Sequence, residues 1–297
     1  MSLWTAIPRG VRDRVTGVVP GWWWVWLRQL REVELDRRWT AGQALRARYP
    51  ELSAEGPGSL EAVEARVYSQ NGEDGIVAWL LAQVGAPNRT FVEFGIEDGT
   101  ECNTANLSRT FGWSGLLLEA DTAQAERARR FYAGFPGVRV VTARVTPENI
   151  DALLREHGPG DADVLSLDID GNDLWVWRAI TAIEPRVVAI EYNSTFGPSR
   201  SVTVPYAEGF DRYREHVSGF YHGASLAALA RVGGDKGYAL VGCDSRGANA
   251  FFVRRGLLGA TVREVDPAAA FRPLWERAHM SVEEQFAQIR HLPLVEV

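Results

Sequence analysis

The sequence predicts a doubly wound α/β fold that is built on a seven-stranded, mostly parallel sheet. Short apolar runs alternate with helical patterns from Thr90 to Glu191, which is typical of parallel strands joined by crossover helices. A turn that is bracketed by Gly95 and Gly99 follows the first of these runs. The last two runs are joined by a short polar turn over residues 244–247, which predicts a hairpin and therefore an antiparallel last strand.

The order of the elements follows from this alternation. The predicted strands cover residues 90–94, 115–118, 138–143, 164–168, 186–191, 238–243 and 248–253. The predicted helices cover residues 21–48, 76–84, 102–110, 122–132, 147–156, 173–180 and 225–236. We expect one helix to begin at Pro147, because proline is favoured at the first helical position, and Gly85 to cap the helix before the first strand. Residues 194–222 form a long irregular insert.

The chain divides into three predicted parts: a helical N-terminal extension over residues 1–56, an α/β domain over 57–255 and a helical C-terminal tail over 256–297. The first boundary lies in a stretch rich in glycine and proline. The chain has 297 residues, of which 46% are apolar and 24% charged, an ordinary globular composition. Its net charge of −6 argues against a nucleic-acid partner. Cys102 and Cys243 have no zinc-type spacing, which indicates a reducing compartment and a cytoplasmic protein.

The N-terminal extension carries a tryptophan cluster over residues 22–26, next to arginines. The longest apolar run, Val15 to Leu27, is broken by Pro20 and Gly21 and is too short to span a membrane. No cleavage site follows it, so we expect the extension to stay on the protein. Such a cluster indicates either peripheral membrane contact or packing on the core or on a second subunit, and we expect a homo-oligomer.

The turn after the first strand predicts a nucleoside site. Ligands of open parallel sheets bind at the carboxyl ends of the strands, and Gly95 and Gly99 let the backbone approach a ligand closely. Glu119 closes the second strand 24 residues after Gly95. An acid at about this distance suits the hydroxyl groups of a ribose.

The acids of this turn decide which nucleoside it suits. Glu97 stands where the dinucleotide fingerprint requires its second glycine. Four acids crowd the turn: Glu93, Glu97, Asp98 and Glu101. They would repel a pyrophosphate, whereas S-adenosylmethionine (SAM) has no phosphate and carries a sulfonium cation. The pattern therefore favours SAM over NAD, and over a turn that binds no ligand.

A second group of polar residues follows the fourth and fifth strands. Asp168, Asp170 and Asn172 follow the fourth, and Glu191 and Asn193 follow the fifth. We expect them to lie close together, at the edge where the cofactor binds. Carboxylates at this density suit Mg²⁺ or Mn²⁺, with Asp168, Asp170 and Glu191 as ligands. The alternative is that the acids cap the following helix.

The insert after the fifth strand supplies candidates for acceptor binding and catalysis. Its aromatic residues suit a sugar or aromatic acceptor; they are Phe196, Tyr206, Phe210, Tyr213, Phe220 and Tyr221. His222 ends the insert and is a candidate general base beside Asp170 and Glu191, although a lone histidine is more often structural.

Three motifs together resemble a known family. Ser69-Gln-Asn-Gly-Glu-Asp74, Phe91-Val-Glu-Phe-Gly95 and Leu165-Ser-Leu-Asp-Ile-Asp-Gly171 resemble the FkbM-type branch of the class I SAM-dependent methyltransferases. The resemblance implies a Rossmann-like fold and O-methylation of sugars or natural products. It also differs in places, because this branch more often carries Lys-x-Asp-x-Glu-Gly at the third motif.

The resemblance also assigns roles at the cofactor site. It implies that Glu93, Gly95 and Gly99 shape the SAM site and that Glu119 holds the ribose. It implies that the segment from Gln70 and Asn71 to Asp74 lies near the methionine end. Asp168 is a further candidate cofactor contact.

Three functions are consistent with the sequence. The first is an O-methyltransferase for a small-molecule hydroxyl. The second is an N-methyltransferase on a similar frame, and the third is a SAM-binding or assembly protein without turnover.

Overall fold

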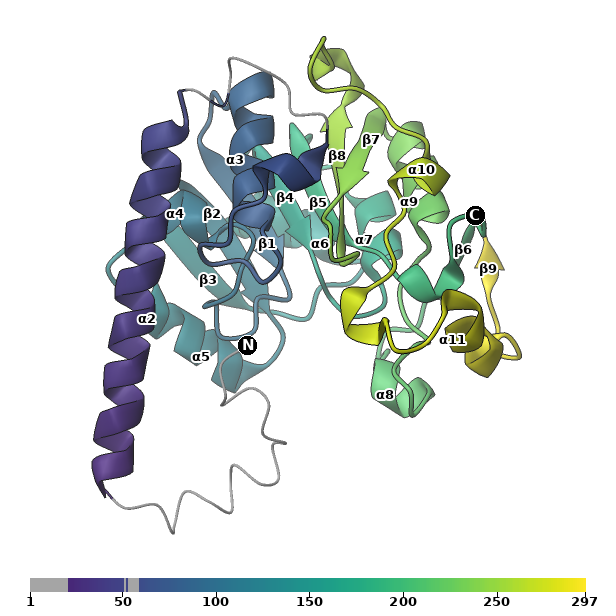
Figure 1. Ribbon diagram of the computed structural model, residues 1–297, viewed down its shortest axis with the longest axis horizontal. Helices are drawn as coiled ribbons and strands as arrows, with labels where there is room; N and C mark the ends of the chain where they lie inside the picture. Colours follow the sequence, from purple (N-terminus) through teal and green to yellow (C-terminus); the bar gives the residue numbers. More distant parts are fainter. Residues whose placement is uncertain (1–20, 51, 53–58) are drawn as a thin grey trace.

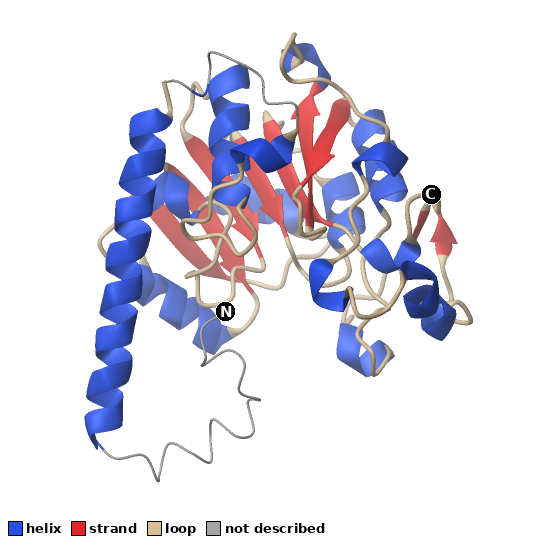
Figure 2. Cartoon of the chain, in the orientation of Figure 1, coloured by secondary structure: helices blue, strands red, loops and turns tan. Residues whose placement is uncertain are grey.

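A seven-stranded sheet forms the centre of the computed structural model, which describes residues 21–50, 52 and 59–297 (Figures 1 and 2). The strand order is β3-β2-β1-β4-β5-β8-β7. β1 to β5 are parallel, and β8 runs antiparallel to both of its neighbours. The strands are β1 Thr90–Phe94, β2 Ser114–Glu119, β3 Val138–Thr142, β4 Val164–Leu167, β5 Val187–Glu191, β7 Tyr238–Cys243 and β8 Asn249–Arg254. The predicted fold class is confirmed.

Helices cover both faces of the sheet. The α-helices are α2 Gly21–Arg48, α3 Glu73–Val84, α4 Ala105–Arg109, α5 Thr122–Phe131, α6 Ile150–His157, α7 Asp173–Ala179, α8 Arg212–Glu215, α9 Leu226–Asp235, α10 Pro267–Ala270 and α11 Val282–Ile289. The 3₁₀ helices are η2 Leu60–Val63, η3 Ser194–Phe196, η4 Arg255–Leu257 and η5 Trp275–Arg277.

The alternation of side chains along each strand produces two core layers. In β1, Val92 packs in one layer, with α6, α7 and α9, whereas Phe91 packs in the other, with α3, α4 and α5. Neighbouring residues of a strand point to opposite faces, so strands buried on both sides read as continuous apolar runs. This burial explains why the strands were predictable from sequence.

The predicted helix starts at residues 76, 102 and 147 each differ by three residues from the observed starts at Glu73, Ala105 and Ile150. The helix expected from Pro147 begins at Ile150 instead. Residues 147–149 form a turn, in which the Asn149 side chain accepts a hydrogen bond from the Thr146 amide and donates to the Arg144 carbonyl, both at 2.8 Å. An asparagine that bonds its own neighbouring backbone favours a turn over a helix.

The C-terminal tail packs on the insert that follows β5. The tail contains the expected helices α10 and α11, and also a strand, β9 Val295–Glu296, which pairs antiparallel with β6 Val202–Thr203 of the insert. Ile289 of α11 is buried in a cluster with Phe196 and Tyr221. The tail therefore completes the structure around the insert.

Within the N-terminal extension, the structure describes the 28-residue helix α2, which runs along one side of the body in Figure 1. We call this helix the N-terminal arm. Leu45 near its end is buried in the core, whereas Trp26, Leu30 and Val33 are exposed at helical spacing. Within the described part of the chain, no helix is long and apolar enough to cross a membrane. Membrane contact and a homo-oligomer stay predictions, as do the domain boundaries.

Two features noted in the sequence lie outside the described residues. These are the start of the apolar run, up to Pro20, and the linker over 53–58.

Candidate active site

The predicted cofactor turn directly follows β1 in the sequence and is hydrogen-bonded to the end of β2. Gly95, Glu97 and Gly99 all have positive φ, at 71°, 50° and 77°. Glu119 at the end of β2 accepts a hydrogen bond from the Glu97 amide at 2.8 Å through one carboxylate oxygen, and from the Asp121 amide at 2.7 Å through the other. The acid predicted to hold a ribose therefore also holds the turn in place.

Gly95 is required by the protein's own packing. A Cβ at this position would lie 1.6 Å from the carbonyl oxygen of Asp168, so the cofactor turn touches the end of β4. At Gly99 a Cβ would lie 2.8 Å from the Tyr132 ring. Close approach of a ligand to these glycines stays a prediction; the structure shows that they also allow close approach of neighbouring parts of the chain.

Glu93 is buried behind the turn. Its carboxylate accepts hydrogen bonds from the Asn103 amide at 2.8 Å, from the Thr104 amide at 3.0 Å and from the Thr104 hydroxyl. Burial raises its pKa. Glu93 thus holds the backbone segment that leads into α4, next to the predicted cofactor turn.

The loop before α3 is held by Asp74. One of its oxygens accepts hydrogen bonds from the amides of residues 67–69 and from the Ser69 hydroxyl, and burial raises its pKa to about 6. Gln70 is exposed and donates to Glu101 at 3.2 Å. Asn71 is half-buried and donates to Glu73. Asp74 therefore presents Gln70 and Asn71 at the surface beside the cofactor turn.

The predicted cluster of acids is present at the ends of β4 and β5. Asp168, Asp170 and Glu191 each offer an oxygen within 4.8 Å of the other two. Asp173, the first residue of α7, holds the preceding loop, because it accepts from the amides of Ile169 at 2.8 Å and Gly171 at 3.0 Å; the side chain of the N-cap residue, Asn172, does not cap the helix. The other three acids are left to face one another.

The pKa values of the cluster are shifted upward. Burial, Asp170 and Asp173 raise the pKa of Glu191 to about 8, against the opposite effect of Arg212. Asp168 is open to solvent on one side, and the protein around its other sides, with Glu191 and Asp170, raises its pKa well above the ordinary range. Like charges this close disfavour each other's ionised forms.

Two arginines that the sequence analysis did not select enter this site. Arg212 of α8 lies 2.6 Å from Asp170 Oδ1 and 3.8 Å from Glu191 Oε1, both measured from its Nη1. Arg277 of the tail donates to Thr195 Oγ1 at 3.0 Å and contacts His222 Nε2 at 3.4 Å. Nothing in the local sequence distinguishes them from the other basic residues.

His222 is buried between Arg277 and Glu191. Its Nδ1 lies 3.6 Å from Glu191 Oε2, and burial together with Arg212 and Arg277 lowers its pKa well below the ordinary value. Because a guanidinium only donates hydrogen bonds, the arginine contact assigns the ring hydrogen to Nδ1, facing Glu191. His222 is therefore neutral and held at Nε2 by Arg277, whereas its Nδ1 faces Glu191 without a hydrogen bond within the described part of the chain.

The two asparagines hold the insert. Asn193 donates to the carbonyls of Phe220 at 2.7 Å and His222 at 2.8 Å, and Asn172 donates to that of Ala207 at 2.9 Å. Three of the insert's aromatic residues, Phe196, Phe220 and Tyr221, are buried. Tyr206 is half-buried and donates to Glu148 at 2.8 Å.

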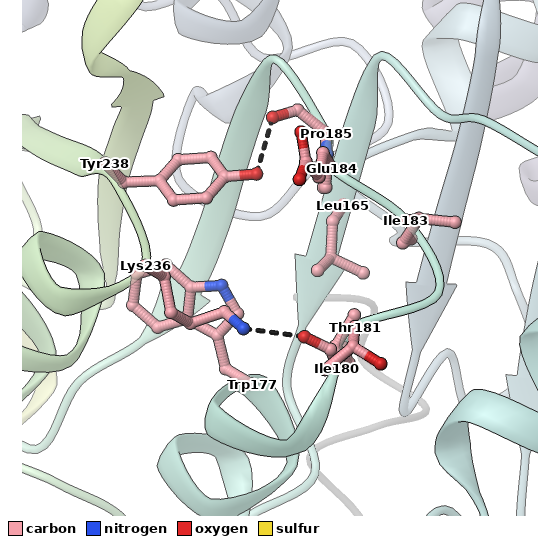
Figure 3. A pocket seen from close by; sticks show the side chains of 9 residues that line it. All are labelled: Leu165, Trp177, Ile180, Thr181, Ile183, Glu184, Pro185, Lys236 and Tyr238. Atoms are coloured by element: carbon pink, nitrogen blue, oxygen red, sulfur yellow. Dashed lines mark hydrogen bonds between the residues drawn. The ribbon is translucent and has the colours of Figure 1, made fainter.

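Two cavities lie at opposite edges of the sheet. One of about 610 Å³ follows β3 at the carboxyl edge and is lined by Arg144, Thr146, Glu148, Asn149, Tyr206 and Glu208. The other, of about 190 Å³, lies at the amino edge (Figure 3). There Lys236 donates to the Ile180 carbonyl at 2.6 Å and Tyr238 to that of Pro185 at 2.7 Å. Only the first cavity shares an edge with the acids and the turn.

The sheet order, the glycine turn and the acid that closes β2 define a SAM-dependent methyltransferase. The comparison with known families agrees: the sequence profile of the Methyltransferase FkbM domain matches residues 59–218, more than half of the chain. The protein belongs to the FkbM methyltransferase family. The resemblance noted in the sequence is thereby confirmed.

Solved structures give distant similarities. The N-terminal domain of EvdMO1, determined in the presence of S-adenosylhomocysteine (SAH) and D-fucose, is 16% identical, with a TM-score of 0.41, over 72% of this chain and 96% of that one. An O-methyltransferase from Bacillus cereus in complex with SAH is 16% identical, with a TM-score of 0.42, over 82% of this chain and 95% of that one. No curated protein matches the chain.

Proposed function

We propose that this protein is an O-methyltransferase that moves the methyl group of SAM to a hydroxyl of a sugar, glycoside or natural product. One observation carries the proposal: the contact between Gly95, which begins the cofactor turn, and Asp168, which begins the acid cluster. A methyl donor bound at the turn would lie beside the acid cluster, where we place the acceptor hydroxyl. Such placement of two reactants supplies a large part of the rate in group transfer.

The turn and its surroundings suit SAM. Glu119 has carboxylate lone pairs beyond the two amide contacts, and these would accept hydrogen bonds from the ribose. The cavity of about 610 Å³ lies on the same edge, one strand further out, and offers space for the nucleoside. Gln70 and Asn71, beside the turn, would face the methionine end.

The acid cluster is proposed to activate the acceptor. The acceptor oxygen attacks the methyl carbon, the carbon–sulfur bond breaks, and SAH leaves while the hydroxyl proton passes to a base. Where no metal ion is bound, Glu191 is the proposed base, because its raised pKa suits proton transfer near neutral pH. His222 is also a predicted candidate base, but both of its ring nitrogens face side chains. We assign it to positioning Glu191.

The cluster also fits one divalent ion. The oxygens lie within 4.8 Å of one another, so small side-chain shifts would bring all three onto one Mg²⁺ or Mn²⁺, and three carboxylates outnumber the single Arg212 that contacts them. Asp168, Asp170 and Glu191 would hold the ion, which when bound lowers the pKa of a coordinated hydroxyl. Asp170 would then help to orient the acceptor by holding the ion to which the acceptor hydroxyl binds.

An N-methyltransferase is the second candidate, because an acidic cluster would also attract an amine. Tritium transfer from methyl-labelled SAM to panels of glycosides, phenols and amines separates the possibilities. Label on hydroxyl acceptors supports the proposal, and label only on amines supports the second candidate. SAM binding by calorimetry without turnover on any acceptor would favour a binding or assembly protein.

A further inference from the structure

We propose that Arg38 of the N-terminal arm is a positioning residue for the cofactor site. Arg38 lies in α2, outside the region that the family profile matches. The inference rests on the proposed placement of SAM on the turn after β1. It gives the arm a function in cofactor binding that neither the family match nor the sequence assigns.

The guanidinium of Arg38 reaches the cofactor turn directly. Nη1 donates to the Thr100 carbonyl at 2.5 Å, and Nη2 lies 3.5 Å from Glu101 Oε1. On its own helix, Nε donates to Glu34 Oε1 at 2.9 Å. The side chain is only 11% exposed, so these bonds are shielded from water and stronger than surface ion pairs.

Arg38 also connects the turn to the second cofactor loop. Glu101 uses its other oxygen to accept a hydrogen bond from Gln70 at 3.2 Å. The guanidinium carbon of Arg38 lies 5.9 Å from the centre of the Tyr68 ring, within the range of a cation–π contact. One side chain of the arm thus contacts both segments proposed to bind SAM, around Gly99 and around Gln70.

The turn needs such a contact because of its charge. It carries Glu97, Asp98 and Glu101 within five residues, and its backbone holds three positive φ angles, at Gly95, Glu97 and Gly99. Closely spaced carboxylates repel one another, and a guanidinium between Thr100 and Glu101 offsets that repulsion. Loss of Arg38 should therefore let the turn move from the conformation that accepts SAM.

The arm has other attachments, so a change at Arg38 tests the turn and not the docking of the whole helix. Leu45 is buried in the core, and Arg46 donates to the Thr110 carbonyl at 2.9 Å. These contacts lie further along α2 and do not involve the cofactor turn.

The neighbouring Arg37 provides a matched control. It bonds the same acid, Glu34, at 2.8 and 2.9 Å, but its side chain is 63% exposed, and no contact joins it to the turn. Arg37→Met and Arg38→Met remove the same charge and keep an apolar stem of similar length. Arg38→Lys keeps the positive charge, but its single ammonium group cannot reproduce the several N–H donors that the planar guanidinium directs to Thr100, Glu101 and Glu34.

The test is calorimetric titration of SAH into the full-length wild type and these three variants. We expect Arg38→Met to raise the Kd for SAH by about fivefold or more, Arg37→Met to stay within about twofold, and Arg38→Lys to fall between. With an acceptor in hand, KM for SAM should rise in Arg38→Met while kcat changes little, a split that a general loss of packing does not produce.

Two outcomes overturn the inference: an Arg38→Met protein with wild-type SAH affinity, or equal losses in Arg37→Met and Arg38→Met. If Arg38→Met does not fold, Arg38→Lys decides, and wild-type affinity in that variant likewise overturns it. Glu119→Ala is titrated in parallel. An unaffected Glu119→Ala protein removes the proposed SAM site itself, whereas weakened Glu119→Ala with unaffected Arg38 variants removes only the inference.

Discussion

Arg212 Nη1 lies 2.6 Å from Asp170 Oδ1, so a side chain of the insert supplies a cation to the acid cluster. One guanidinium offsets one of three carboxylates, and the pKa of Glu191 stays raised, to about 8, in its presence. The cluster therefore lacks enough compensating positive charge, which favours a proton on Glu191; a divalent ion would take the place of that proton. We expect EDTA to lower methyl transfer by about 100-fold or more and added Mg²⁺ or Mn²⁺ to restore it.

Full activity in EDTA would contradict the metal proposal. The acceptor proton would then pass to Glu191, with Arg212 as the compensating charge. SAH affinity provides the control, because chelation should leave it unchanged.

Asp170→Asn should affect the proposed acceptor site and leave the proposed SAM site intact. The change removes a charge that faces the acceptor and keeps the side chain's shape. Turnover should fall by about 100-fold, whereas the Kd for SAH should stay within about twofold. Glu215→Gln, an exposed acid of the insert that lies outside the acid cluster and the cavity, is the control and should keep its turnover. An Asp170→Asn protein with wild-type kcat would remove Asp170 from the acceptor site.

Gly95→Val should abolish SAH binding, because its Cβ would meet the Asp168 carbonyl at 1.6 Å and φ is 71°. The end of β1 would have to move away from β4. We expect a lower Tm as well as lost affinity, measured by thermal unfolding and calorimetry. Gly134→Val is the control, since in the described part of the chain no atom beyond its two chain neighbours lies within 4 Å of a Cβ there. A Gly95→Val protein with normal affinity and Tm would contradict this assignment.

The fold was predictable because it depends on local patterns. Strands buried on both faces read as apolar runs, and acids that follow β4 and β5 must meet at one edge. The arginines were not predictable in the same way, since their contacts join distant positions: Arg38 and Thr100 are 62 residues apart, and Arg212 and Asp170 are 42. A charged side chain has no periodic signature that reveals its partner.

The roles of single acids were equally difficult to predict. The sequence predicts Glu93 and Asp74 at the SAM site; both are buried, and backbone amides donate to both oxygens of Glu93 and to one oxygen of Asp74. A buried carboxylate requires such donors, and only the three-dimensional structure shows which donors are near. The sequence could therefore locate the site more reliably than it could assign its contacts.

Asp74 should make stability depend on pH. Burial raises its pKa from 3.8 to about 6, so the folded state holds the proton more tightly than the unfolded state. This contribution is full below about pH 4 and is lost as the pH rises through 6. From pH 5 to pH 8 the wild type should lose about 1–1.5 kcal/mol of unfolding free energy through this group.

Asp74→Asn cannot ionise, and its amide oxygen can still accept the bonds from residues 67–69. The decrease in stability between pH 5 and pH 8 should therefore be smaller in the variant. Urea unfolding at both pH values measures it. Equal pH dependence in the two proteins would show that Asp74 does not titrate in this range.

The proposed SAM site depends most on Glu119, which we assign to the ribose of SAM. Calorimetric titration of SAH into the wild type, Glu119→Gln and Glu119→Ala tests it directly. A charged hydrogen-bond partner contributes about 1.5–3 kcal/mol, so the Kd should rise by about 10- to 150-fold in Glu119→Ala. Glu119→Gln, which can still accept from the Glu97 amide, should lie between. An unchanged Kd in a folded Glu119→Ala protein would contradict the proposed cofactor site.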